Sequence, residues 1–281
     1  MLARAPASSA NLGPGFDALA LAVALYVEVE VTEAASLRVH LEGEGASLPA
    51  DETNLAVRVA TTVAGHDHLE ITVRSEIPLA RGLGSSAAVA LAAAAAAGAE
   101  DPLAVAVMLE GHPENAAASM RGGLVAAAIA DGEVLTAPLA VDPKLRCVVV
   151  VPDRHLATAD ARRVLPATLS RTDVIFNLQR MGLLVAGLAD LGELGRHAMD
   201  DRVHQPYRES LFPESNLLAT RLRAAGALGA CWSGAGPSIL AIVTAPTSAA
   251  VAAEGRRALG EAKLAGVVLE LGVDHGGLTV R

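Results

Sequence analysis

Aromatic residues are almost absent from this chain, which has one tryptophan, two tyrosines and three phenylalanines among 281 residues. Hydrophobic residues nevertheless make up 52% of the sequence and charged residues only 19%, a balance that argues against intrinsic disorder. The chain can therefore bury a sizeable core, and that core must be built mainly from alanine, valine and leucine.

Lysine is also scarce, because only Lys144 and Lys263 accompany twenty arginines. The formal net charge is −9, whereas proteins that bind nucleic acids or anionic membranes need a basic surface. We therefore predict no nucleic-acid partner and no membrane partner. This charge is still compatible with a local basic pocket for phosphate groups.

The usual signals for export and membrane insertion are missing as well. Met1–Gly15 lacks the charged and then apolar pattern of a signal peptide. The apolar run Ala87–Ala97 is shorter than the roughly 20 residues that span a bilayer. Cys147 and Cys231 lie far apart and form no CxxC motif, which is typical of structural thiols in a reducing compartment. We expect a cytoplasmic protein.

Hydrophobic periodicity predicts an α+β chain in two closely packed domains, residues 1–143 and 144–281. The predicted strands are Leu19–Val31, Leu37–Leu41, Leu69–Arg74, Leu124–Ile129, Val134–Leu139, Arg146–Val151, Leu228–Trp232, Ile239–Val243 and Leu264–Gly272. The predicted helices are Asn54–Ala64, Ser85–Ala97, Pro102–Leu109, Ala159–Leu165, Val174–Leu191, Glu214–Ala225 and Ser248–Ala262. The order strand–helix–strand–strand–helix–strand in the second half predicts a ferredoxin-like α/β sandwich.

A glycine-rich segment, PLARGLGSSAA at Pro78–Ala88, precedes the alanine-rich helix. Gly82 and Gly84 allow a tight turn and a close approach of the backbone to a ligand. Ser85 and Ser86 are expected as N-caps, where the exposed N–H groups and the helix dipole form an anion site. A serine-capped glycine turn without a ligand explains this segment equally. It is neither a GxxxxGK[ST] loop nor a GxGxxG fingerprint.

Two further segments are rich in small and polar residues. Ala7–Asp17, ASSANLGPGFD, lies directly before a predicted strand and forms a turn that presents Asn11 and Asp17, or a polar loop without function. Ser233–Ser238, SGAGPS, lies between two apolar strands and forms either a rigid loop beside another backbone or a simple hairpin turn.

Taken together, the three segments resemble the motifs of the GHMP kinases in order and spacing, and the resemblance covers essentially the whole chain. PxxxGLGSSAA is the ATP loop of that family. Three further stretches resemble the homoserine kinase group within it, namely EGHPEN at 110–115, TADARRVLP at 158–166 and HQPYR at 204–208. The first departs from the group's EGHPDN, because Glu114 replaces an aspartate.

The resemblance implies a fold and an activity. The fold is a ribosomal protein S5 domain 2-like unit followed by a ferredoxin-like sandwich. The activity is the ATP-dependent phosphorylation of the L-homoserine hydroxyl in threonine biosynthesis, with Mg²⁺ and without an obligatory catalytic base. The alternatives are a GHMP kinase for an isoprenoid or sugar alcohol, and a non-catalytic sensor of the same fold. A homodimer is also compatible with the family.

The resemblance also implies the roles of individual residues. ATP binding falls on Pro78, Leu79, Ala80, Arg81, Gly82, Leu83, Gly84, Ser85, Ser86, Ala87 and Ala88, and Mg²⁺ binding on Ser86 and Glu110. Homoserine binding falls on Asn11, Asp17, His112, Asn115, Thr158, Arg162 and Arg208. Asp17 pairs with its ammonium group, and the two arginines hold its carboxylate. Asn11 and Arg162 are the expected catalytic residues, with Asn11 orienting the hydroxyl.

Overall fold

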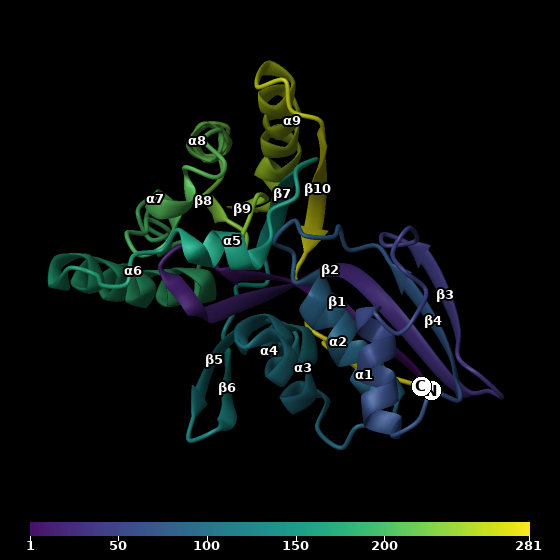
Figure 1. Ribbon diagram of the computed structural model, residues 1–281. Helices are drawn as coiled ribbons and strands as arrows, with labels where there is room; N and C mark the ends of the chain where they lie inside the picture. The colour runs from purple at the N-terminus through teal and green to yellow at the C-terminus, as the bar shows by residue number, and fades with distance from the viewer.

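A computed structural model describes all 281 residues, which form two β-sheets with helices packed on each (Figure 1). The strands are β1 (Leu2–Asn11), β2 (Gly15–Glu33), β3 (Arg38–Gly43), β4 (Leu69–Ser75), β5 (Leu124–Ala130), β6 (Glu133–Leu139), β7 (Arg146–Pro152), β8 (Gly229–Trp232), β9 (Ile239–Val243), β10 (Gly266–Gly272) and β11 (Thr279–Val280). The helices are α1 (Leu55–Ala64), α2 (Ser85–Ala96), α3 (Pro102–Glu110), α4 (Glu114–Arg121), α5 (Thr158–Arg163), α6 (Arg171–Ala189), α7 (Gln205–Arg208), α8 (Ser215–Ala224) and α9 (Ala245–Glu261).

The first sheet is organised around the long strand β2. β1 pairs antiparallel with β2. On β2 itself, the first part also pairs with β5 and the last part with β4. β3 then adds parallel to β4, and β6 pairs with β5. Valines alternate along β2, so that Val27, Val29 and Val31 all point into the core, as a strand with one buried face requires.

Helix α2 runs through the centre of the first unit, against β1 and β2. Nearly all of its side chains are buried, and most of them are alanine. Alanine has the highest helix propensity, and its small side chain lets a helix lie close to a sheet and to its neighbours. This packing aims the N-terminus of α2, which follows the glycine-rich segment, at the second unit (Figure 1).

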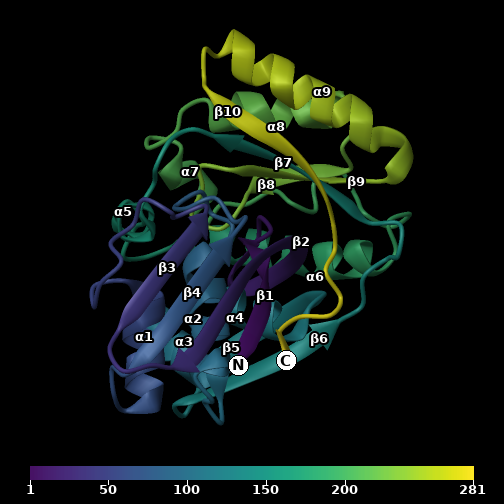
Figure 2. The same ribbon diagram turned by 90° about the vertical axis from the view of Figure 1, so that its right-hand side faces the viewer.

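The second sheet has the order β10-β7-β9-β8 with every pair antiparallel, and α8 and α9 pack on one face (Figure 2). This is the predicted ferredoxin-like arrangement. On the other face, Cys147, Val149 and Cys231 join a core cluster that also contains β1, β2 and α2 side chains. This core cluster therefore extends across both units, while a separate cluster lies between the opposite face of the second sheet and helices α8 and α9.

The C-terminal segment returns to the first sheet after β10. Val273 forms a bridge with Val23, and β11 pairs antiparallel with β1, so the two chain ends lie side by side (Figures 1 and 2). The second sheet begins at β7, close to the predicted division at 143/144. However, the last residues of the chain pair with the first sheet, so one cut at 143/144 does not separate the two sheets completely. That division remains a prediction.

Every predicted strand and helix is present, with ends that differ by a few residues. Four elements were not predicted: β1, α4, α7 and β11. The interpretation of Ala7–Asp17 as a loop is wrong for its first half, because Ala7–Asn11 belongs to the buried strand β1 and the turn covers only Leu12–Pro14. No helix of the structure combines the length and the apolar character that crossing a membrane requires.

Candidate active site

The three glycine-containing segments meet where the two units join. Ser233 Oγ donates a hydrogen bond to the Gly82 carbonyl at 2.6 Å, and a Cβ added to Gly82 would lie 2.1 Å from the Ser233 carbonyl oxygen. A Cβ added to Gly84 would lie 2.3 Å from Ser8 Oγ of β1. The loops therefore need glycine because their backbones touch, as predicted for SGAGPS.

The glycine-rich segment ends directly at the N-terminus of α2. Gly84, with φ of 66°, is the N-cap and has no side chain to satisfy the first amides of the helix. The prediction that Ser85 and Ser86 act as N-caps is wrong, since both already lie within the helix. Ser85 Oγ is buried without a partner, while Ser86 Oγ donates to Glu110 Oε1. The free backbone N–H groups and the helix dipole suit an anion.

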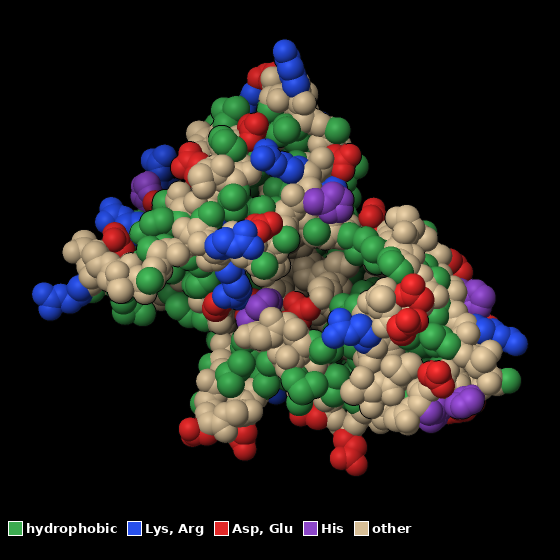
Figure 3. All heavy atoms as spheres, viewed as in Figure 1, with side chains coloured by type: hydrophobic (Ala, Val, Ile, Leu, Met, Phe, Trp, Pro, Cys, Tyr) green, Lys and Arg blue, Asp and Glu red, His purple; other side chains and the backbone are tan.

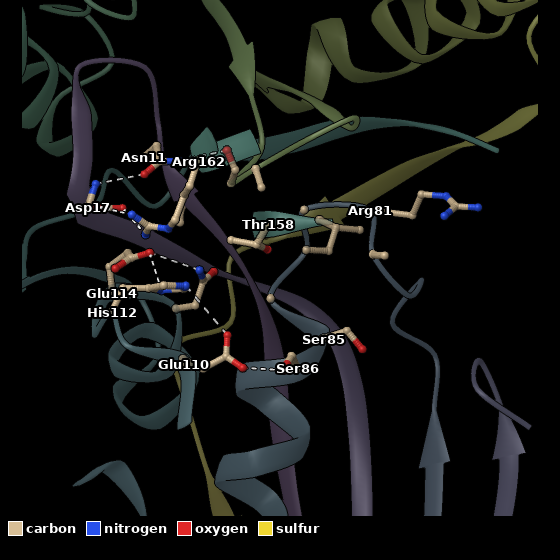
Figure 4. A pocket seen from close by; sticks show the side chains of 18 of the residues that line it. Asn11, Asp17, Arg81, Ser85, Ser86, Glu110, His112, Glu114, Thr158 and Arg162 are labelled. Carbon is tan, nitrogen blue, oxygen red and sulfur yellow. Dashed lines mark hydrogen bonds and ion pairs between the residues drawn. The ribbon is translucent and has the colours of Figure 1, made fainter. Parts of the chain in front are cut away.

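Arg81 points away from this anion site (Figure 4). Its guanidinium donates to Asp153 Oδ1 at 2.7 Å and to the Leu79 carbonyl at 3.1 Å. The side chain thus fastens the back of the loop to the second unit, instead of adding positive charge at the phosphate position. The side chains of Ala87 and Ala88 are buried inside α2. The Ala88 amide donates to the Gly84 carbonyl at 2.9 Å, so it is not free for a ligand.

Beside the loop lies a cavity of about 100 Å³, at the centre of the face where basic, acidic and histidine side chains gather around a hollow (Figure 3). Every residue predicted to bind the acceptor or the metal lines it: Asn11, Asp17, Ser86, Glu110, His112, Asn115, Thr158, Arg162 and Arg208. These residues come from both units, so only the folded arrangement brings them together.

Asp17 and Arg162 form a bidentate ion pair on one wall of this cavity, with both N–O distances at 2.8 Å (Figure 4). The hydrogen bond with Asp17 raises the pKa of Arg162, which stays charged. Asn11 holds the turn before Asp17, since its Oδ1 accepts from the Asp17 amide at 3.0 Å and its Nδ2 donates to the Gly234 carbonyl at 2.9 Å. Asn11 and Asp17 have positive φ, which asparagine and aspartate tolerate better than most residues.

Arg208 is buried behind the same wall, with an exposed fraction of 2%. Its Nε donates to the Ala161 carbonyl, and its Nη1 donates to both His204 Nδ1 and the Gly234 carbonyl at 3.0 Å. Burial lowers the pKa of Arg208 to about 10, so the guanidinium remains charged at neutral pH. Its Nη2 has no partner within the chain and is available to an anionic group in the cavity.

Glu114 is the site residue whose role the sequence did not reveal. It is almost fully buried, its Oε1 lies 3.1 Å from His112 Nδ1, and its Oε2 has no hydrogen-bond partner. The adjacent Glu114 carboxylate raises the pKa of His112, although burial opposes this shift. A buried carboxylate oxygen without a partner is costly, which suggests that a bound cation satisfies it. The substitution of aspartate by glutamate in the motif was the only signal in the sequence.

A second, more apolar cavity of about 170 Å³ adjoins the other side of the glycine loop, at Ser85 and Ser86. Its apolar lining comes from β3, β4, α1, α2 and the intervening loops: Leu41, Leu48, Leu55, Val73, Leu79, Ala80 and Val89. Leu79 and Ala80 belong to the predicted ATP loop, whereas the other five residues were not predicted, because separate elements contribute them and no motif joins them. A flat aromatic group of a phosphate-bearing ligand fits such a surface.

Ser86 and Glu110 form the pair best suited to Mg²⁺. Their side chains are hydrogen-bonded to each other beside the anion site, from α2 and the last residue of α3 (Figure 4). A hydroxyl and a carboxylate are hard oxygen ligands, and Mg²⁺ commonly takes few protein ligands together with phosphate oxygens and water. No group of three or more His, Cys, Asp and Glu side chains forms an all-protein metal cage. The residues therefore fit the ion.

Comparison with known proteins gives one consistent result. Residues 54–123 match the N-terminal domain of GHMP kinases, and residues 183–262 match the C-terminal domain. A homoserine kinase of Solibacter usitatus is 45% identical over 84% of this chain and 83% of its own length. A homoserine kinase of Microchaete diplosiphon is 40% identical over 97% of this chain and 94% of its own.

Solved structures agree with this result. The crystal structure of homoserine kinase from Cytophaga hutchinsonii superposes with a TM-score of 0.86 at 27% identity, covering 100% of this chain and 97% of that one. The L. major mevalonate kinase, solved with R-mevalonate, superposes with a TM-score of 0.72 over 95% of this chain and 94% of that one. Its identity is 17%, so this second likeness concerns the fold alone.

Proposed function

Because this chain belongs to the GHMP kinase family and, within it, to the homoserine kinases, we propose that it transfers the γ-phosphoryl group of ATP to the side-chain hydroxyl of L-homoserine. The product is O-phospho-L-homoserine, an intermediate of threonine biosynthesis. The observation that carries the proposal is a single cavity with a helix N-terminus at one end and Asp17, Arg162 and Arg208 at the other. One end suits a phosphate, and the other suits an α-amino acid.

The amino-acid end offers groups of both signs. Arg162 and the free Nη2 of Arg208 provide a planar positive surface for the α-carboxylate. Asp17 and the unpartnered Oε2 of Glu114 provide acceptors for the α-ammonium group. When substrate binds, its ammonium and carboxylate take over part of the Asp17–Arg162 pair, so neither charge is left unpaired. Thr158, His112 and Asn115 line the space around the side chain.

The nucleotide end recognises ATP mainly through its backbone. We assign the phosphates to the amides from Gly82 to Ala87, the base to the apolar cavity beside Ser85 and Val89, and Mg²⁺ to Ser86 and Glu110. Ser86 and Glu110 would hold the ion there, and its positive charge would neutralise negative charge that develops during transfer. Arg81 supports this end indirectly, by holding the loop against Asp153.

The chemistry we propose is direct in-line transfer. The homoserine oxygen forms a bond to the γ-phosphorus while the bond to the bridging oxygen of ADP breaks, and the hydroxyl proton leaves late, to the transferred phosphoryl group or to water. Asn11 keeps one N–H and one Oδ1 lone pair free for that hydroxyl after its two hydrogen bonds within the protein. Positioning and charge supply the rate, and no side chain is assigned as a general base.

The decisive experiment measures ATP turnover with Mg²⁺ against L-homoserine, L-serine, L-threonine, mevalonate and galactose. A saturable rate with homoserine alone supports the proposal. Turnover of mevalonate or galactose instead would support a kinase of an isoprenoid or sugar alcohol. ATP binding without any turnover would support a sensor.

We also propose a cytoplasmic location. It is supported by Cys147 and Cys231, which are both buried and not joined in a disulfide.

A further inference from the structure

His204 is the one fully buried histidine of the chain, and it contacts the substrate-binding wall without lining the cavity. Its Nε2 lies 2.8 Å from the Gly13 carbonyl, and its Nδ1 lies 3.0 Å from Arg208 Nη1. Its ring stacks on Phe16 with a centroid distance of 5.1 Å. His204 thus touches both Arg208 and the β1–β2 turn, which lies between Asn11 and Asp17 in the chain.

The hydrogen bonds of His204 define its protonation state. A carbonyl can only accept and a guanidinium can only donate, so Nε2 carries the proton and Nδ1 offers its lone pair to Arg208. A second proton on the ring would place two donors face to face. Burial is the main reason that the pKa of His204 falls to about 4, and the positive charge of Arg208 adds to this effect against the opposing Asp201. The ring is neutral when the enzyme works.

We propose that His204 is a positioning residue that fixes the distance between the carboxylate-binding and the ammonium-binding groups. Arg208 projects from the single-turn helix α7, and Asp17 from the start of β2, directly after the turn between β1 and β2. The imidazole joins these elements as a rigid link, with one nitrogen directed at each. Arg208 could otherwise turn toward Asp17, whose charge already acts on it. This inference rests on the proposed function.

Asparagine and glutamine each imitate one nitrogen of the imidazole and therefore separate its two contacts. In His204→Asn the amide oxygen reaches the position of Nδ1 and can accept from Arg208, whereas the contact with Gly13 is lost. In His204→Gln the amide nitrogen reaches the position of Nε2 and can donate to Gly13, whereas the acceptor for Arg208 is lost. Both variants fill most of the buried volume and do not need a new charge.

We expect His204→Gln to raise KM for L-homoserine about 10- to 100-fold, the loss typical of a hydrogen bond to a charged group, with KM for ATP unchanged. His204→Asn should stay closer to the wild type. A second readout compares kcat/KM for L-homoserine with that for 3-aminopropan-1-ol, which lacks the carboxylate. The ratio of kcat/KM for L-homoserine to kcat/KM for 3-aminopropan-1-ol should fall in His204→Gln and stay at the wild-type value in His204→Asn.

The outcomes separate this inference from the proposed function. If the wild-type enzyme does not phosphorylate homoserine, the proposed function is wrong. If it does, an equal rise in KM for ATP and homoserine, or an unchanged ratio between the two acceptors in His204→Gln, would overturn the positioning role alone. Thermal unfolding of each variant identifies a purely structural loss, which changes both substrates together.

Discussion

The two ends of the cavity are built in different ways. At the acceptor end, charged side chains from β2, α5 and α7 are already hydrogen-bonded to one another and to buried carbonyls. At the nucleotide end, backbone amides at a helix N-terminus face the cavity, and Ser85 Oγ has no partner. Side chains in a fixed network discriminate one small molecule from another, whereas backbone amides recognise a phosphate whatever it is attached to. The acceptor end therefore determines which molecule is phosphorylated, whereas the nucleotide end binds phosphate groups in the same way for any acceptor.

The most damaging change should be one that separates the loops at the nucleotide end. In Gly82→Ala the new Cβ would lie 2.1 Å from the Ser233 carbonyl at a residue with φ of 74°, so the backbone must move. We expect kcat/KM for ATP to fall about 1,000-fold, because the amides lose their alignment. Gly65→Ala is the control, since it has φ of 78° but no atom within 4 Å. Equal losses in both variants would show that backbone strain alone is responsible.

A smaller effect should follow when the acceptor end loses one charge. Arg162→Ala removes the partner of Asp17, and we expect KM for L-homoserine to rise about 100-fold with KM for ATP unchanged. Arg163→Ala is the matched control, because Arg163 is exposed and pairs only with Asp160 on the same helix. Steady-state kinetics with each substrate varied in turn will measure this. Loss of ATP affinity in Arg162→Ala would remove the distinction between the two ends.

Glu110→Gln tests whether a carboxylate at the nucleotide end holds Mg²⁺. The amide keeps the size and a hydrogen bond to Ser86 but loses the negative charge. We expect kcat to fall about 30-fold at ordinary Mg²⁺ concentrations and to recover partly as Mg²⁺ is raised, with KM for homoserine unchanged. Glu100→Gln, at an exposed position outside the cavity, should behave like the wild type. A loss that Mg²⁺ does not relieve would contradict this assignment.

The smallest expected effect is on the pH dependence of stability. His204 has a pKa of about 4 in the folded protein against an ordinary histidine value of 6.5, so the unfolded chain binds a proton more readily. Its contribution is present above pH 6.5 and is lost as the pH falls toward 4. Between pH 6.5 and 5 we expect the free energy of unfolding to drop by about 1.5 kcal/mol from this residue. Denaturant unfolding should show a shallower decline in His204→Asn by that amount.

Short motifs predicted much of this protein because their physics is local. Asn54 caps α1 by accepting from the Ala56 amide, and Gly65 ends that helix in the left-handed conformation, so both ends can be read from the sequence. The glycine turn at Gly82 and Gly84 and the start of α2 after it likewise follow from residues that are neighbours in the sequence. The resemblance of the motifs to a known family also linked their polar residues with the recognition of an α-amino acid, without the three-dimensional structure.

Other features depended on contacts that sequence spacing does not reveal. Ser85 and Ser86 match a capping pattern, but Gly84 closes the turn and takes the cap position. Arg81 lies within the nucleotide motif, yet Asp153, distant in the sequence, draws it away. The contact of His204 with the Gly13 carbonyl joins residues far apart in the sequence. Glu114 is close to His112 in the sequence, but only the fold buries its carboxylate and leaves Oε2 without a partner.

The sequence by itself thus determined most of the helices and strands, the family and the chemical types present at the site, because propensity, capping and motif chemistry act over a few residues. Only the tertiary structure decided which groups face the cavity, which charges neutralise each other and which oxygen is left without a partner. These properties arise from burial and from hydrogen bonds between residues far apart in the chain, such as Asp17 with Arg162.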